Sequence, residues 1–203
     1  MSQVRTTAAL IALTLALGAC EAAAPVQPEN ASNAASSQAA VKGGGGANEV
    51  QMYTADLRTL NNSGVTGTAQ LHVTNGTLLA TLHAKGPVPG IRHMQHIHIT
   101  GSCPFPESEF DENGDGLVSF AEGLPAYGGV LVNLNDNLSV PGVSGTFPLT
   151  NPAGVVNFQA KKALTDLPDL DLAGRTVVVH GAFVDGTFNP SLPVACGTVD
   201  PAR

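Results

Sequence analysis

Two histidines separated by one residue, His96 and His98, are the part of the chain best suited to chemistry. Alternate residues of a β-strand project from the same face, so the two side chains would lie about 7 Å apart at their roots and could share one metal ion. Ile97 and Ile99 would face the opposite side and join the core. A third histidine, His180, lies far downstream and is considered together with this pair.

A second group of distinctive residues is acidic. No lysine or arginine occurs between Arg92 and Lys161, whereas six carboxylates crowd one short segment of that stretch: Glu107, Glu109, Asp111, Glu112, Asp115 and Glu122. Carboxylates so concentrated repel one another unless they are solvated or neutralised. A bound cation would remove the repulsion.

The twelve residues 111–122 match the calcium-binding loop of EF-hands at each diagnostic position. Gly116 would make the sharp turn, and oxygen atoms would surround the ion. The predicted calcium ligands are Asp111, Asn113, Asp115, the Leu117 carbonyl, Ser119 (directly or through water) and a bidentate Glu122. The alternative is a solvated acidic turn.

The flanks of this loop are not those of a calcium sensor. Pro104 and Pro106 exclude a long entering helix, and Gly123 with Pro125 is expected to stop the exiting helix after about one turn. We therefore expect calcium to hold the long loop after Cys103 in place, so that this loop covers one side of the histidine site.

The N-terminus is expected to target and anchor the protein. Residues 1–19 are predicted to be a signal peptide, with Arg5 ahead of an uncharged apolar run. Their end is similar to the lipobox of bacterial lipoproteins, which implies lipidation of Cys20; an ordinary secreted protein cleaved nearby is the alternative. Glu21 would then suggest the outer membrane of the bacterial cell envelope. Residues 20–48 are rich in small and polar residues and are expected to form a flexible tether.

The expected pairing of the remaining cysteines follows from that assignment. With Cys20 used for lipid, Cys103 and Cys196 form an even pair in an exported, oxidising setting, so we expect a disulfide, with two free buried thiols as the alternative. The formal net charge of −7 argues against a nucleic-acid partner.

Residues 49–203 are predicted to form one all-β domain. Strands at 66–74 and 77–85 flank Asn75-Gly76, a strong hairpin signal, and leave His72 and His83 as plain surface histidines. Further strands are expected near 51–60, 94–100, 130–134, 155–162, 175–180 and 193–199. About eight short strands with little helix indicate an antiparallel sandwich or barrel.

Four segments in the right order resemble the Cu/Zn superoxide dismutase family. Residues 90–98 resemble its copper-site strand, in which a glycine is followed by a histidine, two residues and a His-x-His pair. Residues 173–181 look like the strand that carries another copper histidine. The segments 195–197 and 101–103 resemble the two halves of the family's disulfide. The resemblance implies a Greek-key β-sandwich or barrel of about eight strands. The EF-hand-like loop would then be a calcium-binding insert in this domain, at residues 104–127.

The resemblance also implies roles for the histidines. His96, His98 and His180 would be copper ligands, and His93 a structural histidine bonded to backbone. Three imidazoles suit copper, although zinc would also accept them. The family's other zinc histidines are missing, since no histidine lies between His98 and His180, so a zinc site is not expected. Glu109 could substitute for the missing bridging histidine.

A further departure concerns catalysis. The family places an arginine that attracts superoxide where this chain has Pro193, and no lysine or arginine lies between Arg175 and Arg203. Three functions stay open: a copper-binding, calcium-stabilised envelope lipoprotein without efficient dismutation, a copper-only superoxide dismutase, and a calcium-stapled structural module with vestigial histidines. The implied partners are metal ions and, through the lipid anchor, a membrane.

Overall fold

The computed structural model describes residues 50–167 and 170–202. The expected signal peptide, the lipidation site Cys20 and the tether through residue 48 lie outside these residues. Within the described ranges, no helix is both long enough and apolar enough to cross a membrane.

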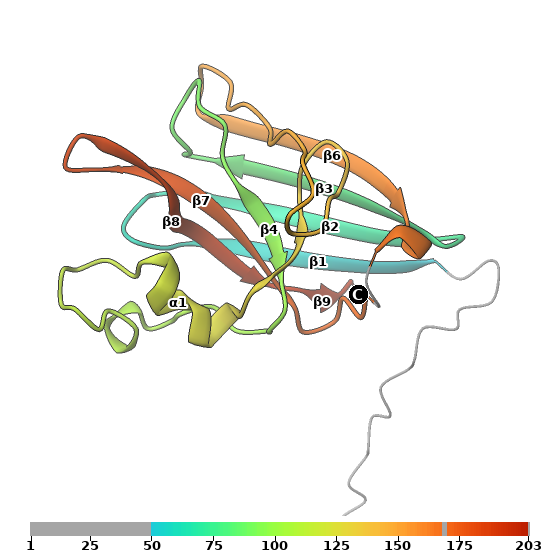
Figure 1. Cartoon of the computed structure of the whole chain (residues 1–203), viewed down its shortest axis with the longest axis horizontal. Helices are drawn as coiled ribbons and strands as arrows, with labels where there is room; N and C mark the ends of the chain where they lie inside the picture. The colour runs from blue at the N-terminus through green and yellow to red at the C-terminus, as the bar shows by residue number, and fades with distance from the viewer. Residues whose placement is uncertain (1–49, 168–169, 203) are drawn as a thin grey trace, which may run out of the picture. The chain divides into compact units, whose positions relative to one another are not determined.

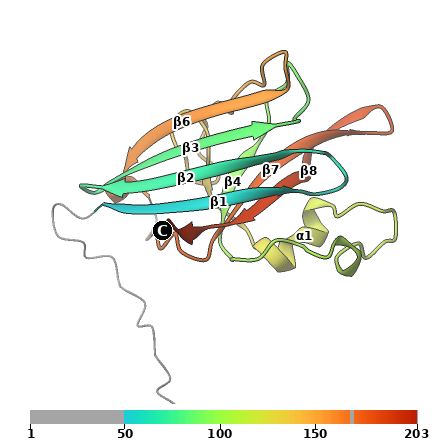
Figure 2. The ribbon, with the colours of Figure 1, turned by 180° about the vertical axis from the view of Figure 1, so that it is seen from behind.

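The described residues form a nine-stranded antiparallel sheet that curls on itself (Figures 1 and 2). Its strands run in the order β5-β4-β7-β8-β1-β2-β3-β6, with β9 paired to β1. The bounds are β1 Gln51–Thr59, β2 Thr66–Thr74, β3 Thr77–Lys85, β4 Gln95–His98, β5 Val130–Asn133, β6 Val155–Ala163, β7 Thr176–Val184, β8 Thr187–Thr198 and β9 Asp200–Pro201. The all-β antiparallel class predicted from the sequence is confirmed.

The hairpin of β2 and β3 shows how alternation builds the core. Leu71 and Ala80 are directly paired and buried, because every second residue of each strand faces inward. Asn75 and Gly76 turn the chain with φ of 49° and 69°, the left-handed conformation that a two-residue hairpin turn needs. His83 is exposed on the outer face and bonds Asn157 through Nδ1 at 2.7 Å. Both strands have the predicted bounds.

The hairpin of β7 and β8 is longer than predicted at its turn. Asp185 and Gly186 make that turn with φ of 49° and 78°. The register of the pair shifts on both sides of His180, between Val179 and Ala182. Such an irregularity re-aims a side chain, and here it lies at the histidine singled out from the sequence.

The predicted disulfide joins Cys103 to Cys196 across 93 residues of chain, with Cα atoms 5.8 Å apart. Cys196 is fully buried in a small cluster with Leu60, Tyr127 and Val178. The bridge therefore fastens the long loop after β4 to strand β8.

Reduction of this disulfide should destabilise the domain. Freeing a loop of this length raises the entropy of the unfolded chain, typically by about 2–4 kcal/mol, which corresponds to a fall in Tm of roughly 5–15 °C. Thermal unfolding with and without reductant measures the change. A variant with both Cys103→Ser and Cys196→Ser should melt, with or without reductant, at the temperature at which the reduced wild-type protein melts. An unfolding curve that reductant leaves unchanged would show that the bridge does not stabilise the fold.

Just before Cys103, the backbone at Gly101 passes very close to the backbone at Gly174. A Cβ added to Gly101 would collide with the carbonyl oxygen of Gly174, whereas one added to Gly129 would meet only Ile99 Cδ1 at 3.4 Å. We therefore expect Gly101→Ala to lower stability by about 1–3 kcal/mol, the usual cost of overpacking, and Gly129→Ala to be nearly neutral. Thermal unfolding of the two variants tests this, and equal melting temperatures would contradict the close crossing.

Candidate metal centre

Three histidine rings come together from two paired strands. His96 and His98 lie on β4, and His180 lies on β7, its antiparallel neighbour. The ring centroids of His96 are 5.7 Å from His98 and 5.2 Å from His180, and the last two rings are 5.9 Å apart. The structure therefore gathers the three residues predicted to be copper ligands.

Hydrogen bonds fix which nitrogen of two rings carries the proton. Nδ1 of His98 lies 2.9 Å from the carbonyl oxygen of Gly128, and Nδ1 of His180 lies 2.9 Å from that of Ser191. A carbonyl oxygen can only accept, so each Nδ1 must donate and each Nε2 keeps a lone pair. Both Nε2 atoms are buried without a hydrogen-bond partner among the described residues. Buried acceptors of this kind normally have a partner, which a metal ion would supply.

All three rings are held in their neutral form. Burial lowers the pKa of His96 to about 4, and the neighbouring His98 ring adds to the shift. Burial likewise lowers the pKa of His98, and that of His180 with help from the other two rings. A neutral imidazole is the form that binds metal, because a proton no longer competes for the lone pair.

Aromatic side chains enclose the cluster. The Tyr127 ring lies 4.6 Å from His98, the Phe120 ring 6.1 Å from His180 and the Phe147 ring 5.4 Å from His96, measured between centroids. The exposed fraction is 0% for His98, 1% for His180 and 7% for His96. Any small molecule that reaches the centre would therefore approach from the His96 side.

His93 is bonded on both ring nitrogens. Its Nδ1 lies 2.9 Å from the carbonyl oxygen of His180 and its Nε2 3.0 Å from that of Val88. Both nitrogens are thus directed at the backbone. This geometry suits the structural role that the family resemblance implies.

Glu109, which could substitute for the missing bridging histidine, lies on the surface of the protein. It belongs to the short 3-10 helix η1 (Glu107–Glu109), and its side chain is exposed, whereas the three rings are buried. The residue of η1 that contacts the barrel is Glu107, whose Oε2 accepts the N–H of Asn61 at 2.7 Å. Across residues 50–167 and 170–202, no group of three His, Cys, Asp or Glu side chains is placed so that it could hold a metal ion.

The predicted calcium loop is folded around its first and last residues. The carboxylate of Asp111 accepts the backbone N–H groups of Gly114, Asp115 and Gly116 at 2.9–3.1 Å. Glu122 Oε2 accepts the N–H of Ser119 at 2.7 Å. This bond and the Ser119 hydroxyl lower the pKa of Glu122, so the carboxylate is kept ionised.

Hydrogen bonds also organise the middle of that loop. Asn113 Oδ1 and Asp115 Oδ1 accept N–H groups two residues further on, from Asp115 and Leu117, and Asn113 Nδ2 donates to Asp115 Oδ2. The polar side chains thus turn back on their own backbone. These hydrogen bonds make the loop a compact turn.

Helix α1 (Phe120–Tyr127) has eight residues, so the expectation that it stops after about one turn is wrong. Ser119 and Glu122 form a capping box that satisfies N–H groups at its start. The buried Tyr127 donates its hydroxyl to the Phe120 carbonyl at 2.9 Å, a bond that joins the two ends of the helix. At the other flank, η1 has three residues, as expected for a segment without a long entering helix.

Asn61 is a residue of this region that the sequence analysis missed. Its Nδ2 donates to the carbonyl oxygens of Val118 and Pro193, both at 2.9 Å, and its Oδ1 accepts the N–H of Val118 at 2.6 Å. Pro193 is the partner of His180 in the β7–β8 register. One buried amide therefore ties the end of the predicted calcium loop to the strand beside the histidines. In the sequence, Asn61 indicates a turn and nothing more.

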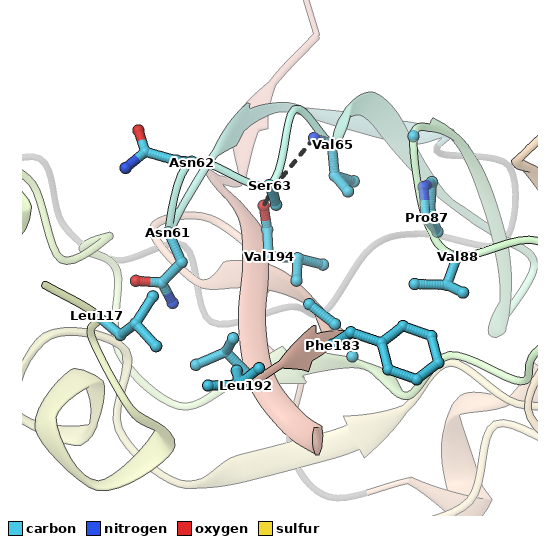
Figure 3. A pocket seen from close by; sticks show the side chains of 14 residues that line it. Asn61, Asn62, Ser63, Val65, Pro87, Val88, Leu117, Phe183, Leu192 and Val194 are labelled. Atoms are coloured by element: carbon cyan, nitrogen blue, oxygen red, sulfur yellow. Dashed lines mark hydrogen bonds between the residues drawn. The ribbon is translucent and has the colours of Figure 1, made fainter. Parts of the chain in front are cut away.

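A separate pocket of about 340 Å³ lies near the β1–β2 turn and the β7–β8 hairpin (Figure 3). It is lined largely by apolar side chains, including Val65, Val88, Phe183 and Leu192. None of its lining residues carries a titratable group, and none is one of the three histidines. The chemistry of the protein is therefore assigned to the histidine cluster and not to this pocket.

No protein-family model matches the chain, and no curated protein matches it. The resemblance to superoxide dismutases thus depends on the motif residues themselves.

Proposed function

We propose that this chain is a copper-binding lipoprotein of superoxide dismutase-like fold, stabilised by calcium and located in the bacterial cell envelope, without efficient dismutation. The observation that supports it best is the pair of buried Nε2 atoms on His98 and His180, unpartnered among the described residues and next to a third neutral ring. Three neutral imidazoles are a donor set for copper or zinc. Copper is preferred because the motif residues resemble the copper strand of the family.

The roles of the chain's own residues follow from the contacts. His96, His98 and His180 would bind the ion, and copper would supply one-electron redox chemistry when bound. The carbonyl oxygens of Gly128 and Ser191 orient two of the rings. The rings of Phe120, Tyr127 and Phe147 would exclude water from the bound ion.

Weak dismutation is proposed because the surroundings do not attract an anion. Pro193 pairs with His180 where the family resemblance predicts a cation. Electrostatic attraction can raise the rate at which an anion reaches a site by about 10–1000-fold, so its loss is costly. The acidic residues of the predicted calcium loop would oppose superoxide further.

A copper-only superoxide dismutase is the second candidate, and Arg92 favours it. This exposed guanidinium donates from Nη1 to the Phe147 carbonyl at 2.6 Å. The Phe147 ring contacts His96, the most accessible of the three histidines. Arg92 thus places a positive charge near the side from which an anion would approach.

Calcium is proposed for residues 111–122, because the loop has the twelve-residue pattern and is already folded around Asp111 and Glu122. The loop leads directly into α1, whose Phe120 and Tyr127 cover the histidines. Calcium would therefore stabilise the wall of the copper centre as well as the loop.

An assay of superoxide dismutation by the copper-loaded protein separates the two candidates. We expect a rate constant close to that of the uncatalysed reaction, because a cation is missing at Pro193. Free copper is itself active, so the protein is first freed of unbound metal and its copper content measured. A rate constant within about 10-fold of diffusion, near 10⁸–10⁹ M⁻¹s⁻¹, would instead support the enzyme. In that case Arg92→Gln should slow it and make it less sensitive to salt.

A further inference from the structure

We propose that Asn61 is the positioning residue of the predicted calcium loop: its side-chain amide holds the Leu117–Val118 peptide group and thereby orients the Leu117 carbonyl, an expected calcium ligand. The orientation of this peptide group can be tested without calcium, whereas its effect on calcium affinity rests on the proposed function. Asn61 is buried and lies outside the loop, in the connection between β1 and β2. In Figure 3 its side chain points toward the segment that carries Leu117.

The contacts of the Asn61 amide determine which of its two ends is the oxygen. Nδ2 lies 2.9 Å from the carbonyl oxygen of Val118 and 2.9 Å from that of Pro193. Carbonyl oxygens only accept, so the group that faces them must be the NH₂ of the amide. The other end, Oδ1, accepts the Val118 N–H at 2.6 Å. Asn61 thus bonds both backbone groups of Val118, as a neighbouring antiparallel strand would.

Val118 is the residue through which the loop joins the core. Its exposed fraction is 0%, whereas residues 111–117 are half-buried or exposed. Buried backbone N–H and C=O groups need hydrogen-bond partners, and the Asn61 amide supplies both of them for Val118. A buried polar group whose hydrogen bonds are paired is rigid, so the peptide group that it holds is fixed as well.

The N–H that Asn61 accepts belongs to the same peptide group as the Leu117 carbonyl. This peptide bond is planar and trans, so the Leu117 oxygen points opposite to the Val118 N–H and away from Asn61. No hydrogen bond to the Leu117 oxygen is present among the residues that the structure describes. In a twelve-residue calcium loop of this pattern the seventh residue contributes its backbone carbonyl, and Leu117 is the seventh residue. Asn61 therefore sets the direction of the backbone carbonyl in the predicted ligand set.

The main chain of Asn61 holds the entrance to the same loop. Its N–H donates to Glu107 Oε2 at 2.7 Å. The Glu107 carbonyl oxygen in turn accepts the N–H of Asp111, the first loop residue, at 3.0 Å. One residue of the β1–β2 connection thus anchors the loop just before it begins and again at its eighth residue. Ligands that are already held lose less freedom on binding, so this anchoring should raise calcium affinity.

The first test uses isotope-labelled protein in excess chelator and NMR. In the wild type, the Val118 N–H should exchange more slowly than the amides of residues 111–117, and a coupling across the hydrogen bond should join its nitrogen to the side-chain carbonyl carbon of Asn61. Asn61→Gly removes the amide and still permits the φ of 55°. Val118 should then exchange roughly 3–10-fold faster, as expected for the loss of one buried hydrogen bond.

Asn62→Gly is the matched control. Asn62 is the next residue, has a φ of 50° and is exposed, and its side chain makes no hydrogen bond within the described part of the chain. The exchange of Val118 should be unchanged in this variant. A wild-type protein without the coupling, or a Val118 amide that exchanges equally fast in the wild type and in Asn61→Gly, would overturn the proposal.

The second test titrates the same three proteins with calcium in a calorimeter. Asn61→Gly should bind calcium about 10–100-fold more weakly, the usual cost of losing a group that orients a metal ligand. Its rise in melting temperature in about 10 mM calcium should be half of the wild-type rise or less, because that rise depends on the ratio of calcium concentration to dissociation constant. Asn62→Gly should match the wild type in both measurements. Unchanged calcium affinity, with an equal loss of stability in calcium and in chelator, would show that Asn61 only stabilises the fold and would refute its positioning role.

The wild-type protein decides the question if Asn61→Gly does not fold. The coupling between Val118 and Asn61, together with a shift of the Leu117 carbonyl carbon resonance on addition of calcium, would support the proposal. Absence of either from a protein that binds calcium would contradict it. If the wild type binds no calcium, the calcium part of the proposed function fails, and the metal-free NMR result alone decides whether Asn61 orients this peptide group.

Discussion

Chelation of calcium should lower the melting temperature by roughly 5–10 °C. Four carboxylates of the loop, those of Asp111, Glu112, Asp115 and Glu122, then repel one another without a cation. Exported calcium modules bind with dissociation constants of about 10⁻⁴–10⁻³ M. At a calcium concentration 100 times the tighter value, binding to the folded state contributes about 2.7 kcal/mol, and a domain of this size melts about 2–4 °C lower for each kcal/mol lost.

The measurement is thermal unfolding in 10 mM calcium and in excess chelator. Glu122→Gln removes one ligand charge and should abolish most of the calcium-dependent shift. Asp185→Asn is the matched control, because Asp185 is an exposed carboxylate in the β7–β8 turn, outside the loop. Magnesium at the same concentration should protect much less. Equal melting temperatures with and without calcium, or equal protection by magnesium, would show that no specific calcium site exists.

The same loop connects the two proposed metals. Helix α1 begins at the last loop residues and ends at Gly128, whose carbonyl oxygen accepts the His98 Nδ1 proton. Asn61 adds a second connection, from Val118 to Pro193 beside His180. Calcium that orders the loop therefore also orders partners of two histidines. By linkage, calcium should tighten copper binding by the same factor by which copper tightens calcium binding.

The strand pattern was predictable wherever its signals were local. The hairpin of β2 and β3 has the bounds expected from alternation and from Asn75-Gly76, because the turn residues themselves set the register. At the turn end of β8 the same reasoning failed. A strand was expected only near 193–199, yet β8 begins at Thr187 and includes Pro190, where its register shifts beside His180. A proline is tolerated at such a bulge, since the ladder is interrupted there anyway.

Helix α1 shows where tertiary structure overrides a local signal. Gly123 and Pro125 have low helix propensity, and they predicted an early end. The capping box at Ser119 and the burial of Tyr127 against the disulfide cluster extend the helix nonetheless. Neither contribution can be evaluated from the segment alone, because Tyr127 gains its partners only when β7 and β8 are in place.

The residues of the candidate site also fall into two groups, those that the sequence indicated and those that it did not. His96 and His98 were identifiable from their spacing, and His180 from the family resemblance. Asn61 was not, because the partners of its side-chain amide lie on a loop and a strand far apart in sequence. A pattern of residue types indicates which groups can bind a metal. It does not indicate which groups hold them in place.

Loss of His180 should abolish tight copper binding. His180→Gln removes one of three nitrogen ligands, which should cost more than the roughly 10–100-fold typical of an outer partner. Glutamine is polar and close to histidine in size, so the fold should survive. The measurement is the copper content after dialysis against a weak chelator, together with the nitrogen hyperfine pattern of Cu(II) in electron paramagnetic resonance.

The matched control is His83→Gln, which removes an exposed histidine bonded to Asn157 on the outer face of the sheet. It should leave the copper content and the spectrum unchanged, because His83 is exposed on β3, which β8, β1 and β2 separate from β7 in the sheet. If copper stays bound to His180→Gln with the wild-type spectrum, the three rings are not the site. If both variants lose copper equally, the metal is bound by scattered surface histidines. Loss in His180→Gln alone would place the ion between the rings of β4 and β7, whose centroids lie 5.2–5.9 Å apart.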